Sequence, residues 1–393
     1  MDADAVVIGA GIVGASCAFF LARGGLCVTI VERGGVASGT SGSGEGNIVL
    51  SDKAPGPELE LAKPALRLWA SLARELPDDF EYEEKGSVVV AETEEHLRTL
   101  TASVRALQGA GVTARMLDTA ELREAEPYLA RDVAGAALFP HDAQVQPMLA
   151  SAALVRAARR QGATFLNHTR VLAIERDRDG AVRGVATSVG RIRTPRVVVA
   201  AGPWSAEVAA MAGVDLPIQP RKGHIVVTEP LPRLVYHKVL EASYADTVSS
   251  GDAALQVATV VEGTRSGTIL LGSSRQRVGV EPTIETHVLR AIVRKAVRYF
   301  PVLATANALR AYVGFRPYAP DHLPLIGPAP GVPGLYINSG HEGSGICLGP
   351  ISGKLLSQIV LDQPPDMDPA PFRPARFESR PAVDRGETCA LRR

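Results

Sequence analysis

Three glycines near the start of the chain have the spacing of a nucleotide-binding turn. Gly9, Gly11 and Gly14 follow the apolar run AVVI and open a segment with helical spacing, and a second apolar run, CVTIV, ends directly before Glu32. This is the pattern of a dinucleotide-binding βαβ unit. The first glycine makes the tight turn, the second lets the backbone approach a pyrophosphate, and the third lets helix and strand pack closely. Glu32 would accept hydrogen bonds from a ribose hydroxyl, and the pattern by itself leaves NAD and FAD open.

A second glycine-rich segment, GHEGSGI at 340–346, leads into the last helical stretch of the chain. A helix that begins there offers free N–H groups and the positive end of its dipole to a developing negative charge. A glycine turn of purely structural purpose is the alternative. His341 is a candidate for hydrogen bonding to a cofactor or substrate, although a lone histidine is as often structural.

Two charged residues could act on a substrate. Arg316, in the segment GFRP, offers a planar fork that suits a carboxylate. Glu45 stands in a loop of small residues. It is either a pocket acid that recognises a substrate ammonium or a side chain that points to solvent, because the direction of the loop cannot be read from the sequence.

The elements that would hold these residues alternate between strands and helices, which is typical of an α/β protein. Pro64 is expected to interrupt the first helix after the βαβ unit, and the last three strands alternate like antiparallel strands with one exposed face. Helices are expected at 58–76, 93–109, 118–125, 147–162, 284–300 and 346–361. Strands are expected at 82–91, 164–175, 181–188, 196–200, 223–229, 255–261 and 268–273. The helix at 284–300 would pack through one apolar stripe, formed by Ile284, Val288, Ile292 and Phe300.

This order of elements predicts two interleaved domains. A Rossmann-like cofactor domain is assigned to 1–82, 142–216 and 309–377, and an α+β substrate domain built on an antiparallel sheet to 83–141 and 217–308. The proline-rich tail at 378–393 is expected to be poorly ordered.

The composition excludes several classes of protein. Lys+Arg and Asp+Glu are 42 each, so no net charge favours nucleic acid or an anionic membrane. Four scattered cysteines without a CxxC pair argue against a disulfide framework or a metal site, and favour a reducing, cytoplasmic location. The charge-free run at 5–22 follows two acids and contains the glycine turn, so we expect neither a membrane span nor a signal peptide.

Six segments give the chain a close resemblance, nearly end to end, to the D-amino acid oxidase superfamily of flavoproteins, which includes glycine oxidase and sarcosine oxidase. They are GAGIVGAS at 9–16, VER at 31–33, GTSGSGEGNI at 39–48, VVVAAGPWS at 197–205, GFRPYAPDHLPLIG at 314–327 and SGHEGSGICLGPISG at 339–353. Three segments are most similar to a narrower group within the superfamily: SGEGNIVLSDK, LLGSSRQRVG and GHEGSGICLGP. That group contains the catalytic subunits of D-hydroxyproline dehydrogenase, opine oxidase, hydrogen cyanide synthase and dye-linked proline dehydrogenases.

The resemblance implies FAD, held noncovalently because no cysteine falls where the covalent relatives attach theirs. It places the hydroxyls of Thr40 and Ser41 on the pyrophosphate, the glycine-rich loop and the 340–346 turn beside the flavin ring, and the backbone of Val171 on the adenine. The cofactor-binding residues expected in this way are Gly9, Gly11, Ile12, Val13, Gly14, Glu32, Arg33, Thr40, Ser41, Gly44, Gly46, Asn47, Val171, Gly202, Trp204, Gly340, Gly343, Ser344, Gly345 and Ile346.

The resemblance also implies the chemistry. A small amino or imino acid, such as a D-amino acid, a proline or hydroxyproline, or an N-substituted amino acid, would be oxidised at its C–N bond by hydride transfer to flavin N5. The electrons would pass to O2 or to a partner redox subunit, in a homo- or hetero-oligomer. Arg316 matches the family's substrate-binding arginine. Glycine oxidase-like members carry a second arginine where this chain has Gly343, and Arg275 either compensates for it or is a surface charge. A flavin-bearing assembly protein without catalysis is the alternative from another class.

Overall fold

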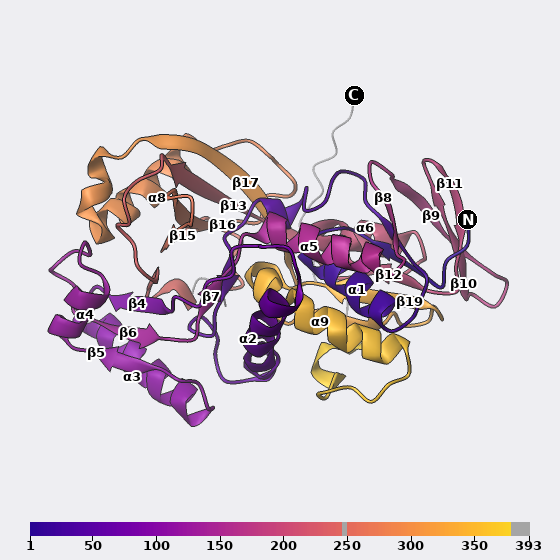
Figure 1. Cartoon of the computed structure of the whole chain (residues 1–393), viewed down its shortest axis with the longest axis horizontal. Helices are drawn as coiled ribbons and strands as arrows, with labels where there is room; N and C mark the ends of the chain where they lie inside the picture. Colours follow the sequence, from indigo (N-terminus) through magenta and orange to yellow (C-terminus); the bar gives the residue numbers. More distant parts are fainter. Residues whose placement is uncertain (246–249, 379–393) are drawn as a thin grey trace.

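Two large sheets lie toward opposite ends of the long axis of the molecule (Figure 1). The computed structural model describes residues 1–245 and 250–378. The six-stranded sheet contains, in spatial order, β18 (Leu325–Pro328), β19 (Leu335–Ser339), β12 (Val197–Val199), β1 (Ala5–Ile8), β2 (Val28–Val31) and β8 (Thr164–Leu166). The eight-stranded sheet contains β17 (Ala308–Tyr318), β13 (Gln219–Thr228), β16 (Ile269–Arg275), β15 (Gln256–Gly263), β14 (Lys238–Glu241), β4 (Ser87–Ala91), β6 (Gly135–Phe139) and β5 (Arg115–Leu117).

The first residues form the predicted βαβ unit. β1 is parallel to β2 on one side and to β12 on the other, and α1 (Ile12–Arg23) connects β1 to β2. Every residue of β1 and β2 is buried, as expected for parallel strands that are covered on both faces. The charge-free run at 5–22 is therefore β1 and α1. No helix in the described part of the chain is long and apolar enough to cross a membrane.

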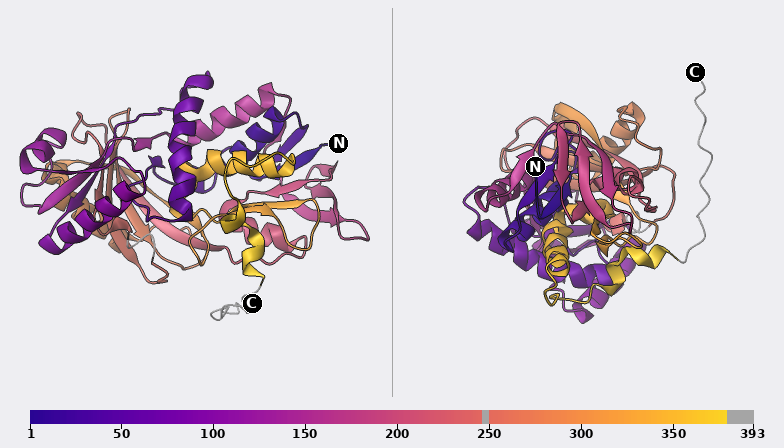
Figure 2. Two further views of the ribbon diagram at one scale, coloured as in Figure 1. Left: turned by 90° about the horizontal axis from the view of Figure 1, so that it is seen from below. Right: turned by 90° about the vertical axis from the view of Figure 1, so that its right-hand side faces the viewer.

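The six-stranded sheet is the middle of three layers. α1, α5 (Pro147–Arg160) and α9 (Gly345–Val360) pack on one face (Figure 2). On the other face lies a small antiparallel sheet, with which the large sheet shares a second apolar core. Its strands are β9 (Val171–Arg176), β10 (Val182–Thr187) and β11 (Gly190–Arg193). The short helix α6 (Ser205–Ala210) also packs against this core.

The prediction of a single strand at 164–175 is wrong. Residues 164–166 are β8 of the large sheet, whereas 171–176 are β9 of the small sheet. His168 between them has a φ of 47°, which is a left-handed turn conformation. The turn redirects the chain from one sheet to the other.

The predicted interruption at Pro64 is also wrong. α2 (Pro57–Glu75) is continuous through Pro64. The missing N–H of Pro64 deprives the Glu60 carbonyl of its helical partner, and Glu60 is exposed, so water can bind that carbonyl instead. Farther along α2, the Trp69 indole donates to the carbonyls of Ile346 and Cys347 at 3.1 and 3.0 Å. α2 is thereby attached to the start of α9.

The eight-stranded sheet is covered on both faces, contrary to the prediction of an exposed face. α8 (Thr286–Tyr299) packs through Val288 and Ile292 on one face. Leu240 and Val260, on the opposite face, belong to the core that includes Trp69 of α2. The sheet therefore carries buried apolar residues on both of its faces.

The remaining helices of this half lie close to their predicted bounds. α3 (Glu94–Gly109) and α4 (Thr119–Ala125) are confirmed. α8 begins later than predicted, since Glu285 before it has extended backbone and accepts a hydrogen bond from Lys222 of β13. Ile284 therefore precedes the helix and is 44% exposed instead of joining the apolar stripe.

The two halves meet where chain segments pass between them. β3 (Asn47–Ile48) pairs there with β7 (Ala143–Gln144). The predicted boundary at 308/309 falls at the start of β17, and β17 pairs along its length with β13. The change of sheet therefore comes after Tyr318, and the domain bounds as a whole stay a prediction. The tail predicted at 378–393 lies, except for its first residue, outside the described residues.

The contact of α1 with α9 should be intolerant of an added methyl group. A Cβ on Gly353 would lie 2.7 Å from the Ser16 carbonyl carbon and Cβ. We expect Gly353→Ala to lower the free energy of unfolding by about 1–3 kcal/mol, measured by denaturant unfolding.

Gly109→Ala at the end of α3 is the matched control, because a Cβ there meets no atom within 4 Å. It should leave stability unchanged or raise it by up to about 1 kcal/mol. Equal effects of the two substitutions would contradict the close helix contact.

Candidate active site

A cavity of about 510 Å³ is lined by residues of both halves of the chain. The β1–α1 turn and the ends of β2 and β12 contribute from the cofactor half. Gly223 of β13, Arg316 of β17 and Tyr244 contribute from the substrate half. Of the predicted site residues, the cavity is lined by Gly9, Gly11, Ile12, Val13, Glu32, Arg33, Thr40, Ser41, Gly44, Glu45, Asn47, Val171, Gly202, Trp204, Arg316, His341, Gly343, Gly345 and Ile346.

The glycine turn has the geometry that its spacing predicts. Gly9 has a φ of 111°, and a Cβ there would lie 2.4 Å from the carbonyl oxygen of Ala200. A Cβ on Gly14 would lie 2.1 Å from the Gly9 oxygen. Gly14 does not line the cavity; it allows α1 to pack on the turn. The N-terminus of α1 is thereby presented to the cavity.

Glu32 is fixed at the end of β2. Its carboxylate accepts hydrogen bonds from the N–H groups of Ala10 at 2.9 Å and Gly34 at 2.8 Å. Beside it, the guanidinium of Arg33 lies 3.9 Å from the ring centroid of Trp204. One end of the cavity is therefore lined by the Glu32 carboxylate and by the stacked side chains of Arg33 and Trp204.

The hydroxyls of the Thr40–Gly42 turn connect this loop to its surroundings. Ser41 Oγ accepts from the N–H of Ile12 at 2.9 Å, at the N-terminus of α1. Thr40 Oγ1 donates to the carbonyl of Phe315 at 2.5 Å. The loop is therefore attached to both the cofactor turn and β17.

Three more of the predicted cofactor residues do not line the cavity but shape it from behind. A Cβ on Gly46 would lie 1.8 Å from the oxygen of Val145. Gly340 has a φ of 82°, where a side chain would be strained. Ser344 Oγ instead donates to Glu58 at 2.5 Å. Direct contact of these residues with a cofactor is not supported by their positions.

His341 lines the cavity in a neutral form. Burial lowers its pKa to about 3. Its Nε2 lies 2.9 Å from Ser352 Oγ, and its Nδ1 is buried without a hydrogen-bond partner among the described residues. The ring is therefore uncharged at neutral pH.

A cluster of arginines surrounds one acid at the substrate end. Arg316 Nη1 donates to the carbonyl of Ser274 at 2.9 Å, and part of the side chain remains accessible from the cavity. Glu342 Oε1 lies 3.4 Å from Arg221 Nη1 and 3.6 Å from Arg275 Nε. Burial raises the pKa of Glu342, but Arg275, Arg316 and Arg221 outweigh it and hold the pKa below its ordinary value. The acid therefore stays ionised among the arginines.

Arg275 is not a surface charge. Its side chain is 1% exposed and does not itself line the cavity. Its Nη2 donates at 2.9 Å to the hydroxyl of Tyr244, which does line it. Arg275 thus acts on the cavity through Tyr244.

The alternatives for Glu45 are separated by its burial. Glu45 is 7% exposed and lines the cavity, so it does not point to solvent. Its Oε1 packs so closely on Gly272 that a Cβ added to that glycine would lie 2.0 Å from this oxygen. Its Oε2 accepts a hydrogen bond from Asn47 Nδ2 at 3.4 Å. Burial raises the pKa of this carboxyl above its ordinary value, although the nearby Lys238 opposes the shift.

Tyr244, Arg221 and Glu342 were not predicted from the sequence. The one feature of the sequence that pointed to Glu342 is its position next to His341, a predicted site residue. Arg221 and Tyr244 reach the site only through the pairing of distant strands.

The residues present fit FAD. The N-terminus of α1 and the hydroxyls of the 40–42 turn suit a pyrophosphate, and Glu32 suits a ribose. The N-terminus of α9, with Gly345 and Ile346 at the wall, suits a ring that gains negative charge. No group of three or more His, Cys, Asp or Glu side chains that could hold a metal ion occurs within residues 1–245 and 250–378.

Comparisons with known proteins agree with this geometry. The family described as FAD dependent oxidoreductase matches residues 4–359. The chain is 31% identical to the hydrogen cyanide synthase subunit HcnC of Pseudomonas aeruginosa, over 97% of both chains. It is 30% identical to glycine oxidase of Geobacillus kaustophilus, over 97% of this chain and 99% of the relative.

Solved structures are similar over the same extent. The crystal structure of glycine oxidase from Geobacillus kaustophilus has a TM-score of 0.87 at 28% identity, and covers 95% of this chain and 99% of its own. That of L-proline dehydrogenase from P. horikoshii has a TM-score of 0.86 at 25% identity, and covers 96% and 98%. The predicted α/β class with a Rossmann-like domain is confirmed. The eight-stranded sheet is antiparallel, as predicted, except for the pair of β4 with β14, which is parallel.

Removing the Glu32 carboxylate should weaken FAD retention. Loss of a charged hydrogen-bond acceptor predicts a cost of about 1.5–3 kcal/mol for Glu32→Ala, and Glu32→Gln, which keeps one acceptor oxygen, should lose less. Flavin dissociation constants from fluorescence titration of the apoprotein measure this. Glu207→Ala, which removes an exposed acid at the cavity wall, is the control. Unchanged affinity in Glu32→Ala would restrict Glu32 to supporting the glycine turn.

The flavin should be released by acid precipitation. Among the described residues that line the cavity there is no cysteine. Cys347 is buried behind the wall, and burial raises the pKa of its thiol to about 12, which disfavours the reactive thiolate. The yellow colour is expected in the supernatant, and a yellow pellet would contradict noncovalent binding.

Proposed function

The chain belongs to the family of FAD dependent oxidoreductases, and from that premise we propose that it oxidises the C–N bond of a small amino or imino acid to an imine. FAD is its cofactor. The observation that carries the proposal is the position of Arg316, whose guanidinium would suit a carboxylate and which lies on the wall of the same cavity as the glycine turn and the N-terminus of α9. Glycine oxidase, iminodiacetate oxidase and L-proline dehydrogenase among the relatives support the substrate class.

When bound, FAD supplies a two-electron acceptor for the hydride that leaves the substrate α-carbon. The chain's own part is to bind and orient the substrate. Arg316 would bind the carboxylate bidentately, with its Nη1 held by Ser274. Gly223 leaves room for this guanidinium, because a Cβ there would lie 2.2 Å from Arg316 Nη1. The fixed guanidinium determines which substrate bond faces the cofactor.

The N-terminus of α9 would stabilise the negative charge that arrives with the hydride. The free N–H groups at Gly345 and Ile346 and the helix dipole act together there. Tyr244, oriented by Arg275, offers a hydroxyl at the substrate end. Orientation and electrostatics of this kind suit an oxidation that requires no strong base at carbon.

A second candidate is a catalytic subunit that passes electrons to a partner's redox centre. It is favoured because HcnC is by name a subunit of hydrogen cyanide synthase. The two candidates share the same half-reaction and differ in the electron acceptor. An anaerobic screen for flavin bleaching with D- and L-amino acids, N-substituted amino acids, prolines and opines tests the shared half-reaction. Reoxidation of the reduced protein by O2 then separates the candidates.

Arg316→Lys should impair oxidation of amino acids more than oxidation of amines. An ammonium cannot reproduce the planar fork, so we expect weaker apparent binding and slower flavin reduction with an amino acid, and little effect with its decarboxylated analogue. FAD content should match that of the parent. Rapid-mixing measurements of flavin reduction with both substrates, in parent and variant, decide this.

The matched control is Arg310→Lys, since Arg310 lies on the same strand but is exposed. It should leave both rates unchanged. Equal losses for the amino acid and its analogue in Arg316→Lys would mean that Arg316 supports the fold or the flavin.

A further inference from the structure

Glu45 lies where the cavity meets the inner face of the eight-stranded sheet. Its Oε1 packs against Gly272 of β16, and its Oε2 accepts from Asn47. It also lines the same cavity as Arg316. A substrate whose carboxylate is bound by Arg316 therefore shares this chamber with a buried acid.

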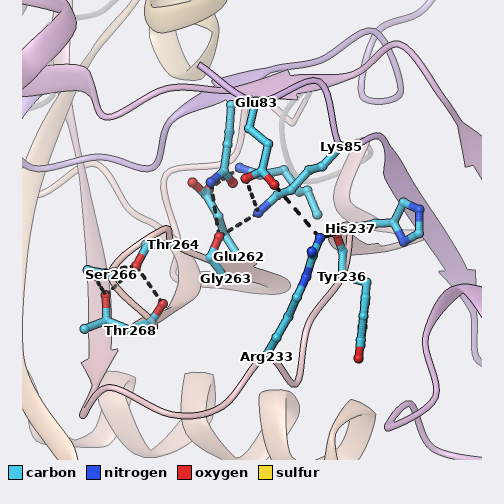
Figure 3. Close-up of polar contacts among 12 residues, drawn as sticks. Glu83, Lys85, Arg233, Tyr236, His237, Glu262, Gly263, Thr264, Ser266 and Thr268 are labelled. Atoms are coloured by element: carbon cyan, nitrogen blue, oxygen red, sulfur yellow. Dashed lines mark hydrogen bonds and ion pairs between the residues drawn. The ribbon is translucent and has the colours of Figure 1, made fainter. Parts of the chain in front are cut away.

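A row of polar groups leads from Glu45 to the surface. Asn47 of β3 is directly opposite Gln144 of β7. Gln144 Nε2 donates to the carbonyl of Gly263 at 3.1 Å. Lys85 Nζ donates to the same oxygen at 2.6 Å (Figure 3). Lys85 Nζ lies 3.9 Å from Glu83, whose side chain is 39% exposed.

Successive members of this row have unused acceptor atoms. Glu45 Oε1, Asn47 Oδ1 and Gln144 Oε1 are all buried without a hydrogen-bond partner among the described residues. Buried acceptors of this kind normally bind water. Glu45 and Asn47 line the cavity, and Gln144 lies between Asn47 and Lys85, so a water bound at each oxygen would connect the cavity to Lys85.

The charges around Glu45 suit proton exchange. Burial raises the pKa of Glu45, and burial lowers the pKa of Lys85 to about 8, so each group is easier to neutralise than an exposed one. The titratable groups that influence Glu45 are Lys238 of β14, Glu262 of β15, Arg275 of β16, Arg316 and Tyr312 of β17, and Tyr244. Lys238 and Glu262 form a buried ion pair beside the row.

We propose that Glu45 accepts the proton of the substrate ammonium, and that water molecules held by Asn47, Gln144 and Lys85 conduct this proton to Glu83 at the surface. The proposal rests on the proposed function, because an ammonium cannot lose hydride until its nitrogen has a lone pair. One N–H bond of the ammonium breaks and an O–H bond forms on Glu45. The lone pair then becomes the C=N bond as the α-hydrogen leaves with its two electrons to the flavin, so the substrate is oxidised by two electrons and the flavin reduced by two.

Glu45→Gln tests the acceptor, since it keeps the size of the side chain and its bond to Asn47. In the parent, the rate of anaerobic flavin reduction should rise with pH through the pKa of Glu45, because only the carboxylate accepts a proton. In the variant, the rate at neutral pH should fall about 10²-fold, and its rise with pH should move to the ionisation of the free amine. A merely positioning glutamate would leave the pH profile unchanged.

Two readouts do not depend on turnover. The carbonyl stretch of protonated Glu45 should titrate in the infrared spectrum of the oxidised holoenzyme and be missing in Glu45→Gln, whereas that of Asp142, whose pKa burial raises to about 6, should remain. A carboxylate ligand without an amine should bind equally to both proteins, because Arg316 is intact. If the parent spectrum and that of Glu45→Gln titrate identically, Glu45 is not the acceptor.

Lys85→Met tests the exit. In a weakly buffered single turnover, proton release measured with an indicator dye should coincide with flavin reduction in the parent and lag about tenfold in the variant. Lys63→Met is the matched control, since Lys63 also donates to a backbone carbonyl and pairs with a glutamate. Release with parental timing in Lys85→Met would overturn the route.

Failure of the two proposals can be told apart. A parent that no amino acid reduces contradicts the proposed function. A parent that is reduced, with Glu45→Gln reduced at the same rate and with the same pH profile, contradicts only the role of Glu45.

Discussion

The active site depends on how closely α1 can approach α9. Gly349 and Gly353 of α9 face Ile12 and Ser16 of α1, and a side chain at either glycine would meet them within 3.2 Å. Because no side chain separates the helices there, both N-termini open on the same cavity. Two positive dipole ends then act on one ligand. A dinucleotide with a pyrophosphate at one end and an electron-accepting ring at the other fits this arrangement, whereas a single helix end could serve only one of the two groups.

A second constraint is the placement of like charges. The register of β13 with β17 sets Arg221 directly opposite Arg316, and like charges in that position are destabilising. Glu342 offsets part of this repulsion and stays ionised in return. Glu342 belongs to the turn before α9, in the cofactor half. Arg221 and Arg316 of the substrate half therefore have an acid that offsets their repulsion only when the two halves are packed together.

The parts of the site that could be predicted are those that local spacing determines. The Gly9 turn and Glu32 lie within one βαβ unit, and Arg316 lies in a short distinctive segment. Tyr244 and Arg221 could not be predicted, because strand pairing brings them in from distant positions. The direction of Glu45 remained open for a related reason, since it depends on contact with Gly272 of another sheet. Two errors in the fold differ in cause: the exposed position of Glu60 allows α2 to continue through Pro64, whereas the second face of the eight-stranded sheet is covered by distant parts of the chain.

The cofactor and substrate ends of the cavity are mechanically connected. Thr40, in the loop expected at the pyrophosphate, donates to the carbonyl of Phe315, the residue before Arg316. A Cβ on Gly314 would lie 2.8 Å from Ser43 of the same loop, so β17 and the loop cannot move independently. Side chains alternate between the faces of a strand, so a one-residue shift of β17 would turn Arg316 away from the cavity. The loop expected at the pyrophosphate thus also fixes the register on which the proposed carboxylate binding depends.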